Sequence, residues 1–232
     1  MELHPEFQPS LIHPFYFVRH GIREGVMKYA SHMSGHMLDF GCGSKPYKTL
    51  FNVEEYTGVD FENEGHPHTN EQIDVFYDGK SIPFPDQHFD SVICSEVFEH
   101  IFNLDDILKE LNRVMKPGAK MIVTCPFTWN EHEAPFDFAR YTRFALESML
   151  DKNGFRIVEY SKAGNFITAI TQLITLYFFT VFKGPVRKFF LFRWLYKIFF
   201  FFLPNLAGLV MSKLLPFNQT MYLNNIVLVQ KK

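Results

Sequence analysis

Residues 95–100 (Ser-Glu-Val-Phe-Glu-His) bring two carboxylates and an imidazole close together in the chain. Glu96, Glu99 and His100 stand at i, i+3 and i+4, so a helix beginning there would carry all three on one face. Such groups take protons from substrates or bind divalent cations. We therefore treat these three residues as a candidate metal site and His100 as a candidate base. The simpler alternative is a hydrogen-bonded helix start from which Ser95 and Glu96 contact a cofactor.

Residues 127–142 hold a second group of side chains suited to chemistry. The ordinary pKa of a histidine, ~6.5, suits proton abstraction near neutral pH, so His132 is the leading candidate for a general base. Arg140 can pair with an acidic group of a substrate or with Asp137. We expect Asp137, Arg140 and Tyr141 to contact the substrate; the alternative is that they fasten this loop to the next helix.

A glycine turn follows the first apolar run, where residues 39–43 read Asp-Phe-Gly-Cys-Gly. Two glycines let the backbone approach a ligand that a Cβ would block. Pro46 replaces the third glycine of the dinucleotide fingerprint and no Walker Gly-Lys-Ser/Thr is present, which disfavours pyrophosphate binding. Asp60 ends the next apolar run, where a carboxylate can accept both hydroxyl protons of a ribose.

Short apolar runs that alternate with helical patterns supply the scaffold for these residues. We expect a helix over residues 12–32, a helix capped by Asn103 with an apolar stripe from Leu104 to Val114, and a helix over 142–153. Strands are expected at 37–40, 55–60, 72–76, 89–94, 120–125, 156–160 and 226–229. This alternation predicts an α/β fold with a mainly parallel sheet.

The motifs and their order resemble those of class I S-adenosylmethionine-dependent methyltransferases of the methyltransferase-11 type, over about residues 36–160 and again at 225–230. Residues 38–43 are similar to the family's first motif, Asp60 falls where the family binds the ribose, and Asp78 with the following Ile-Pro-Phe is similar to the pattern that contacts the adenine amine. The resemblance implies a Rossmann-like sheet of seven mostly parallel strands with an antiparallel last strand, and S-adenosylmethionine as cofactor. The implied cofactor contacts are Asp39, Gly41, Cys42, Gly43, Asp60, Phe61, Asp78, Ser95 and Glu96.

Two stretches extend this resemblance toward the chemistry. Residues 95–100 are similar to the metal-binding stretch of ubiquinone-biosynthesis O-methyltransferases and small-RNA 2′-O-methyltransferases, which implies a cation such as Mg²⁺ on Glu96, Glu99 and His100, with His132 as a further ligand. Glu-His also occurs here in family members with no known metal. Residues 132–142 resemble a signature of methyltransferases met in cell-surface polysaccharide and lipid pathways. The implied reaction is displacement at a sulfonium methyl group, so the protein mainly positions the acceptor and tunes charge.

The charges of the chain are strongly segregated. Its 232 residues carry a formal net charge of −2, but no Asp or Glu follows Glu159. Residues 165–232 contain 8 of the 23 Lys and Arg and 12 of the 28 Phe. An acidic globular part is thus joined to a basic, Phe-rich part, which indicates an anionic surface as partner. Composition excludes disorder, collagen and disulfide scaffolds.

The basic part separates the last two expected strands by far more than an ordinary loop. We expect a methyltransferase core at 1–164, a hydrophobic helical insertion at 165–217 and the last strand within 218–232. Its helices are expected at 166–182, 186–203 and 205–215.

Three arrangements of this insertion are open. It can lie in a membrane interface, where Tyr177, Trp194 and Tyr196 suit the headgroup level. It can pack on the sheet or form a homodimer. It can also cross the bilayer as a two-span hairpin, which is disfavoured because Arg193 and Lys197 would lie inside the second span.

These observations favour a methyltransferase that O-methylates a lipid-linked or amphipathic small molecule, such as a quinone precursor or glycolipid intermediate. We expect it in the cytoplasm, peripheral on the inner face of the membrane, because its three cysteines have no CxxC spacing and no signal peptide is recognisable. No nucleic-acid partner is expected. The alternative is a non-catalytic, cofactor-binding adaptor that serves as a membrane or assembly module.

Overall fold

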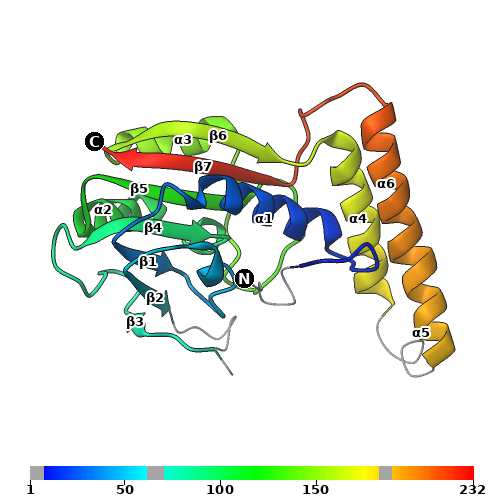
Figure 1. Ribbon diagram of the computed structural model, residues 1–232, viewed down its shortest axis with the longest axis horizontal. Coiled ribbons are helices and arrows are strands. Elements are labelled where there is room, and N and C mark those ends of the chain that lie inside the picture. The colour runs from blue at the N-terminus through cyan, green and yellow to red at the C-terminus, as the bar shows by residue number, and fades with distance from the viewer. Residues whose placement is uncertain (1–7, 62–70, 183–189) are drawn as a thin grey trace.

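The computed structural model describes residues 8–61, 71–182 and 190–232. Its centre is one seven-stranded sheet of order β3-β2-β1-β4-β5-β7-β6 (Figure 1). The strands are β1 (His36–Phe40), β2 (Glu55–Phe61), β3 (Val75–Tyr77), β4 (Phe89–Ser95), β5 (Met115–Pro126), β6 (Phe155–Ala163) and β7 (Asn224–Lys231). Only β7 runs antiparallel to its neighbours β5 and β6. The predicted fold class, including the antiparallel last strand, is confirmed.

Successive side chains of the strands alternate between two apolar cores, one on each face of the sheet. Leu38 and Phe40 of β1 enter the core with α2 (Leu104–Val114) and α3 (Arg143–Lys152), whereas Met37 enters the core with α1 (Tyr16–Ala30). Strands covered by helices on both faces are buried throughout, as β7 is along most of its length. The sheet is therefore a three-layer platform whose parallel strands end at one edge.

Local signals set most helix boundaries. The apolar stripe of α2 is buried over its whole length, as expected. Asn103 precedes α2, but its side chain makes no capping hydrogen bond, so that part of the expectation was wrong. Thr142 caps α3 by accepting the backbone N–H of Ala145. The expected strands at 120–125 and 156–160 are longer than predicted. In β5, Met115 pairs with Phe89 of β4 and Pro126 with β7, and pairing with β7 extends β6.

Between β6 and β7 the chain forms a helical hairpin of α4 (Phe166–Val181) and a second, longer helix that runs back beside it (Figure 1). The longer helix comprises α5 (Phe190–Lys197), a π-helical turn (Ile198–Phe202) and α6 (Leu203–Leu214). Two helices separated near Pro204 had been expected. The helix continues because Pro204 falls in the first turn of α6, directly after the wider π turn. The part of the expected helix at 186–189 lies outside the described residues.

The hairpin stands at the edge of the sheet toward which the parallel strands point (Figure 1). Among the described residues, Phe192–Leu214 is the one helix that is long and apolar enough to cross a bilayer, judged by length and composition alone. The expectation that Tyr196 lies at a headgroup level was wrong: its side chain is buried in the hairpin and its hydroxyl donates to the carbonyl oxygen of Phe178.

Candidate active site

The glycine turn after β1 is held against the end of β2. The backbone N–H groups of Gly41 and Cys42 both donate to the carbonyl oxygen of Val59. The N–H of Gly43 donates to Asp60 Oδ2 at 2.7 Å. Gly41 has φ +73°, and a Cβ there would collide with the side chain of Val97. This position therefore requires glycine for both backbone conformation and space.

A pocket opens beside this turn, and its empty space of about 600 Å³ includes the open solvent at its mouth. Five of the predicted cofactor residues line it: Gly41, Gly43, Asp60, Phe61 and Glu96. The remaining lining residues are Phe40, Tyr77, Val97, His100, Ile101 and Glu133. A carboxylate at a strand end, a turn with two glycines and aromatic rings nearby suit a nucleoside with a charged tail. The pocket thus fits S-adenosylmethionine.

Asp39 and Cys42 lie behind the pocket lining. Both are buried, and the Tyr56 hydroxyl donates to the Asp39 carboxylate. Burial raises the pKa of Asp39 to about 7, while the Tyr56 hydroxyl opposes that shift. Burial also raises the pKa of the Cys42 thiol, which packs against Gly58 of β2. These two residues shape the turn from behind.

Asp78 and Ser95 also lie outside the pocket lining. Asp78 Oδ1 accepts the backbone N–H groups of Lys80 and Ser81 at 2.8 Å each, and these bonds lower the pKa of its carboxyl. Ser95 Oγ lies 2.9 Å from Thr124 Oγ1. Their contacts with a cofactor remain predictions.

Glu96, Glu99 and His100 do not share a helical face, so the geometry expected for them was wrong. Glu96 has a left-handed φ of +58°, and only Phe98–His100 forms a single 3₁₀ turn. The Glu96 carboxylate accepts hydrogen bonds from Thr124 Oγ1 at 2.8 Å and Asn224 Nδ2 at 2.7 Å. Burial raises the pKa of Glu96 to about 7. These bonds tie the pocket-lining carboxylate to β5 and β7.

The structure instead brings Glu99 and His100 together with His132. One potential ligand atom of each lies within 4.8 Å of the others. Glu99 is fully buried, and neither of its carboxylate oxygens has a hydrogen-bond partner among the described residues. Burial raises the pKa of Glu99, and the nearby Glu96 raises it further. His100 Nδ1 donates to the carbonyl oxygen of Phe136 at 2.7 Å, so in the neutral ring the lone pair is on Nε2.

His132 is oriented by a carboxylate that is itself held by an arginine. Its Nδ1 lies 3.2 Å from Asp137 Oδ2, and its backbone N–H donates to the same oxygen. Arg140 binds both oxygens of Asp137 at 2.6 and 2.7 Å. Burial alone would raise the pKa of Asp137, but these hydrogen bonds lower it to about 2. Burial and the neighbouring His100 lower the pKa of His132.

Arg140 and Tyr141 are engaged within the protein. Arg140 also donates to the carbonyl oxygens of Asn130 and Ala139, and the carbonyl of Tyr141 accepts from Asn225 Nδ2. Burial raises the pKa of the Tyr141 hydroxyl to about 12. These bonds fasten the loop, which favours the structural alternative for both residues. Substrate contact remains a prediction.

Sequence reasoning missed Glu133 and Asn224. Glu133 lines the pocket and its Oε2 lies 3.8 Å from His100 Nε2; its place beside His132 was an available signal. Asn224 holds Glu96 from a position 128 residues further along the chain, and no local pattern announces it.

A mostly parallel seven-stranded sheet with an antiparallel last strand, and a glycine turn and an acidic strand end beside a pocket, agree with what the resemblance to class I S-adenosylmethionine-dependent methyltransferases implies. Residues 38–123 match the family model described as a methyltransferase domain. The predicted recognition is confirmed: this chain carries the methyltransferase domain of that class.

Among curated proteins, the chain is similar to ubiquinone/menaquinone biosynthesis C-methyltransferases UbiE. It is 44% identical over 46 residues to that of Laribacter hongkongensis, and 37% identical over 54 residues to that of a Shewanella species. These matches cover 20% and 23% of this chain and 19% and 21% of the relatives, so the chain spans about a fifth of the relatives it matches.

Solved structures share the fold over most of the chain. A SAM-dependent methyltransferase from Archaeoglobus fulgidus aligns with TM-score 0.55 at 18% identity, covering 97% of this chain and 96% of that one. The [4+2]-cyclase SpnF aligns with TM-score 0.58 at 17% identity, covering 90% and 81%. The fold is therefore shared with a protein named for a different reaction.

Proposed function

We propose that this protein transfers a methyl group from S-adenosylmethionine to a hydroxyl group of a lipid-linked or amphipathic small molecule. The observation that carries the proposal is the Arg140–Asp137–His132 chain, which ends beside the pocket residue His100. S-adenosylmethionine, when bound, supplies an electrophilic methyl group.

The orientation of His132 suits a general base. Because Asp137 is held as a carboxylate by Arg140, it accepts the Nδ1 proton and leaves Nε2 of His132 with its lone pair. The His132 and His100 rings lie 4.7 Å apart, centroid to centroid. A hydroxyl in the pocket mouth near His100 would then lose its proton to His132 Nε2 as it attacks the methyl group.

A divalent cation is a second way to activate the same hydroxyl. Buried Glu99, whose oxygens have no described hydrogen-bond partner, would hold it with His100 and His132. One carboxylate and two imidazoles suit Mn²⁺, Fe²⁺ or Zn²⁺ better than the predicted Mg²⁺, which prefers oxygen ligands. Such an ion would stabilise the alkoxide form of the acceptor.

The amphipathic acceptor is supported by the surroundings of the loop. Trp129 of this loop packs in the same apolar cluster as Phe15 and Leu209, and Leu209 belongs to the hairpin. An apolar hairpin packed against the loop that carries His132 favours a substrate with an apolar part. The short matches to ubiquinone/menaquinone biosynthesis C-methyltransferases support an amphipathic, quinone-like acceptor, although those relatives are named for C- rather than O-methylation.

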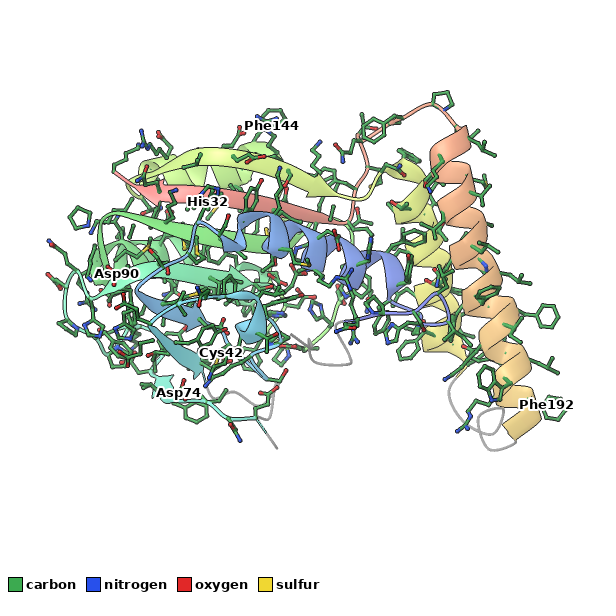
Figure 2. All side chains as sticks on the ribbon, viewed as in Figure 1. His32, Cys42, Asp74, Asp90, Phe144 and Phe192 are labelled. Carbon is green, nitrogen blue, oxygen red and sulfur yellow. The ribbon has the colours of Figure 1, made fainter. Side chains whose placement is uncertain are left out.

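The test is transfer of an isotope-labelled methyl group from S-adenosylmethionine into a lipid extract, with mass spectrometry of the product. We expect His132→Gln to lower the rate 10²- to 10⁴-fold while cofactor affinity stays the same. His32→Gln is the matched control, since His32 is exposed and lies far from the hairpin end of the molecule (Figure 2).

The comparison of these outcomes separates the candidate functions. Cofactor binding without any labelled product would support the adaptor alternative. If His132→Gln forms the labelled product at an unchanged rate, His132 is not the general base. Loss of activity with a chelator and recovery with Mn²⁺ would favour the cation.

A further inference from the structure

The polarity of α4 is inverted with respect to an ordinary surface helix. Thr168, Thr171, Gln172 and Thr175 are buried, with Gln172 and Thr175 fully so, whereas Thr180 near the end of the helix is exposed. Its exposed side chains include Ile170, Leu173, Ile174, Tyr177 and Val181. A surface helix in water normally turns its apolar stripe to the core. This helix turns it outward.

The buried polar residues fasten the hairpin to the start of α1. Gln172 Oε1 accepts the N–H groups of Phe17 and Val18 at 3.1 Å each, and its Nε2 donates to the carbonyl oxygen of Pro14 at 2.7 Å. Asn205 of α6 donates to the carbonyl oxygens of Leu11 and His13. Both helices are thus hydrogen-bonded to the core domain.

The two helices also pack closely on each other. A Cβ at Gly208 of α6 would lie 2.6 Å from Thr171 Oγ1 of α4, so glycine permits their approach. The Phe178 and Phe200 rings lie 4.4 Å apart at the other end of the seam. The hairpin is therefore one folded unit with a fixed outer surface.

That outer surface is apolar and basic. On the longer helix the exposed apolar side chains are Phe192, Trp194, Leu195, Ile198, Phe199, Leu203, Leu206, Val210, Met211 and Leu214. Arg193, Lys197 and Lys213 are exposed among them, and the chain has no acidic residue beyond Glu159. Apolar patches of this extent mark interaction sites.

We propose that the outer faces of α4 and of the helix from Phe192 to Leu214 dock into one leaflet of an anionic lipid bilayer without crossing it. Apolar side chains would enter the acyl boundary while Arg193 and Lys197 meet lipid phosphates. A two-span hairpin conflicts with the bonds of Gln172 and Asn205, because both helices would have to leave the core. An isologous dimer through this face would set one acid-free basic surface against an identical one.

This docking goes beyond the proposed methyl transfer and would serve an adaptor equally well, so its test reads binding alone. Full-length protein is floated with vesicles of phosphatidylcholine, with and without phosphatidylglycerol. We expect binding to the anionic vesicles, and a loss of about tenfold in partition for Phe192→Ser. Phe144→Ser is the matched control: Phe144 is 77% exposed and Phe192 59%, and Phe144 lies on α3, away from the hairpin (Figure 2).

Charge is tested in the same assay. Each of Arg193→Gln and Lys197→Gln should lower partition onto anionic vesicles about fivefold, and less at high salt. The proposal is overturned if the unchanged full-length protein does not bind vesicles. It is also overturned if the Phe192→Ser variant binds them as well as the unchanged protein does. A solution dimer that dissociates in Phe192→Ser, without vesicle binding, assigns the face to a second copy of the chain.

The single-leaflet arrangement has its own test. Thr180 is exposed near the end of α4, and the three native cysteines are buried. In spheroplasts of an expression host, Thr180→Cys should react with an impermeant maleimide only after lysis. Labelling of intact spheroplasts would show that the hairpin crosses the membrane.

Discussion

The exchange of one inward and one outward side chain of α4 tests the inverted polarity directly. Gln172 is fully buried and is the acceptor for two N–H groups in the first turn of α1, which have no partner within their own helix. Replacement by Leu, a side chain of similar size, leaves both donors buried and unpaired. The carbonyl oxygen of Pro14 keeps its bond from Thr175 Oγ1.

The expected cost follows from these bonds. A buried donor without a partner costs about 1–3 kcal/mol, so Gln172→Leu should lower the free energy of unfolding by roughly 2–5 kcal/mol. For a chain of this size each kcal/mol shifts Tm by about 2–4 °C, so a fall of roughly 5–15 °C is expected. Urea unfolding followed by circular dichroism, without lipid, measures the difference.

Leu173→Gln is the matched reverse change on the next residue. Leu173 is 40% exposed on the outer face, so this variant should change the free energy of unfolding by less than about 0.5 kcal/mol, yet weaken vesicle binding. If Gln172→Leu costs nothing and Leu173→Gln destabilises the fold, the polarity of α4 is assigned the wrong way round. The membrane proposal would then lose its main support.

Three further predictions concern the pocket. Asp60→Ala should weaken S-adenosylmethionine binding at least tenfold, about 1.4 kcal/mol, and an unchanged affinity by calorimetry would refute its ribose role. Gly41→Ala should abolish cofactor binding or destabilise the fold, because the new methyl group collides with Val97; a crystal structure with an unchanged turn would contradict this. The folded pKa of Asp39, about 7, lies above its unfolded value near 3.9, so its carboxyl favours the fold below pH 4 and loses that contribution as pH rises through 7. Asp39→Asn should therefore be a few kcal/mol more stable than the unchanged protein at pH 8 and equal to it at pH 4, as measured by urea unfolding; a constant difference across pH would contradict the assignment.

The pocket motifs were readable because they are local. The turn at residues 39–43 and the strand end at Asp60 stand next to apolar runs, and neighbouring parallel strands must end at the same edge of the sheet. Period-two and helical patterns likewise located all seven strands and the first four helices, with errors at their ends. Those ends depend on pairing, as β5 shows where β4 and β7 extend it and β6 where β7 extends it.

The helical assumption at residues 95–100 failed because a local pattern cannot foresee a left-handed residue. Glu96 adopts φ +58° where Thr124 and Asn224, both distant in the chain, hold its carboxylate. The same folding moves His132 next to Glu99 and His100, a grouping the spacing alone did not give.

By itself, the sequence determined an α/β fold of the methyltransferase type and the division into an acidic core and a basic, apolar insertion, because the motifs are local and the charge division follows from composition. Only the tertiary structure decided which way the insertion faces. Thr168, Thr171, Gln172 and Thr175 dilute an apolar helix when read along the chain. In the fold all four turn inward. Gln172 and Thr175 pair there with N–H groups of α1 and with the carbonyl oxygen of Pro14, while Thr168 and Thr171 bond within α4 and its cap. The apolar side of α4 is left outside.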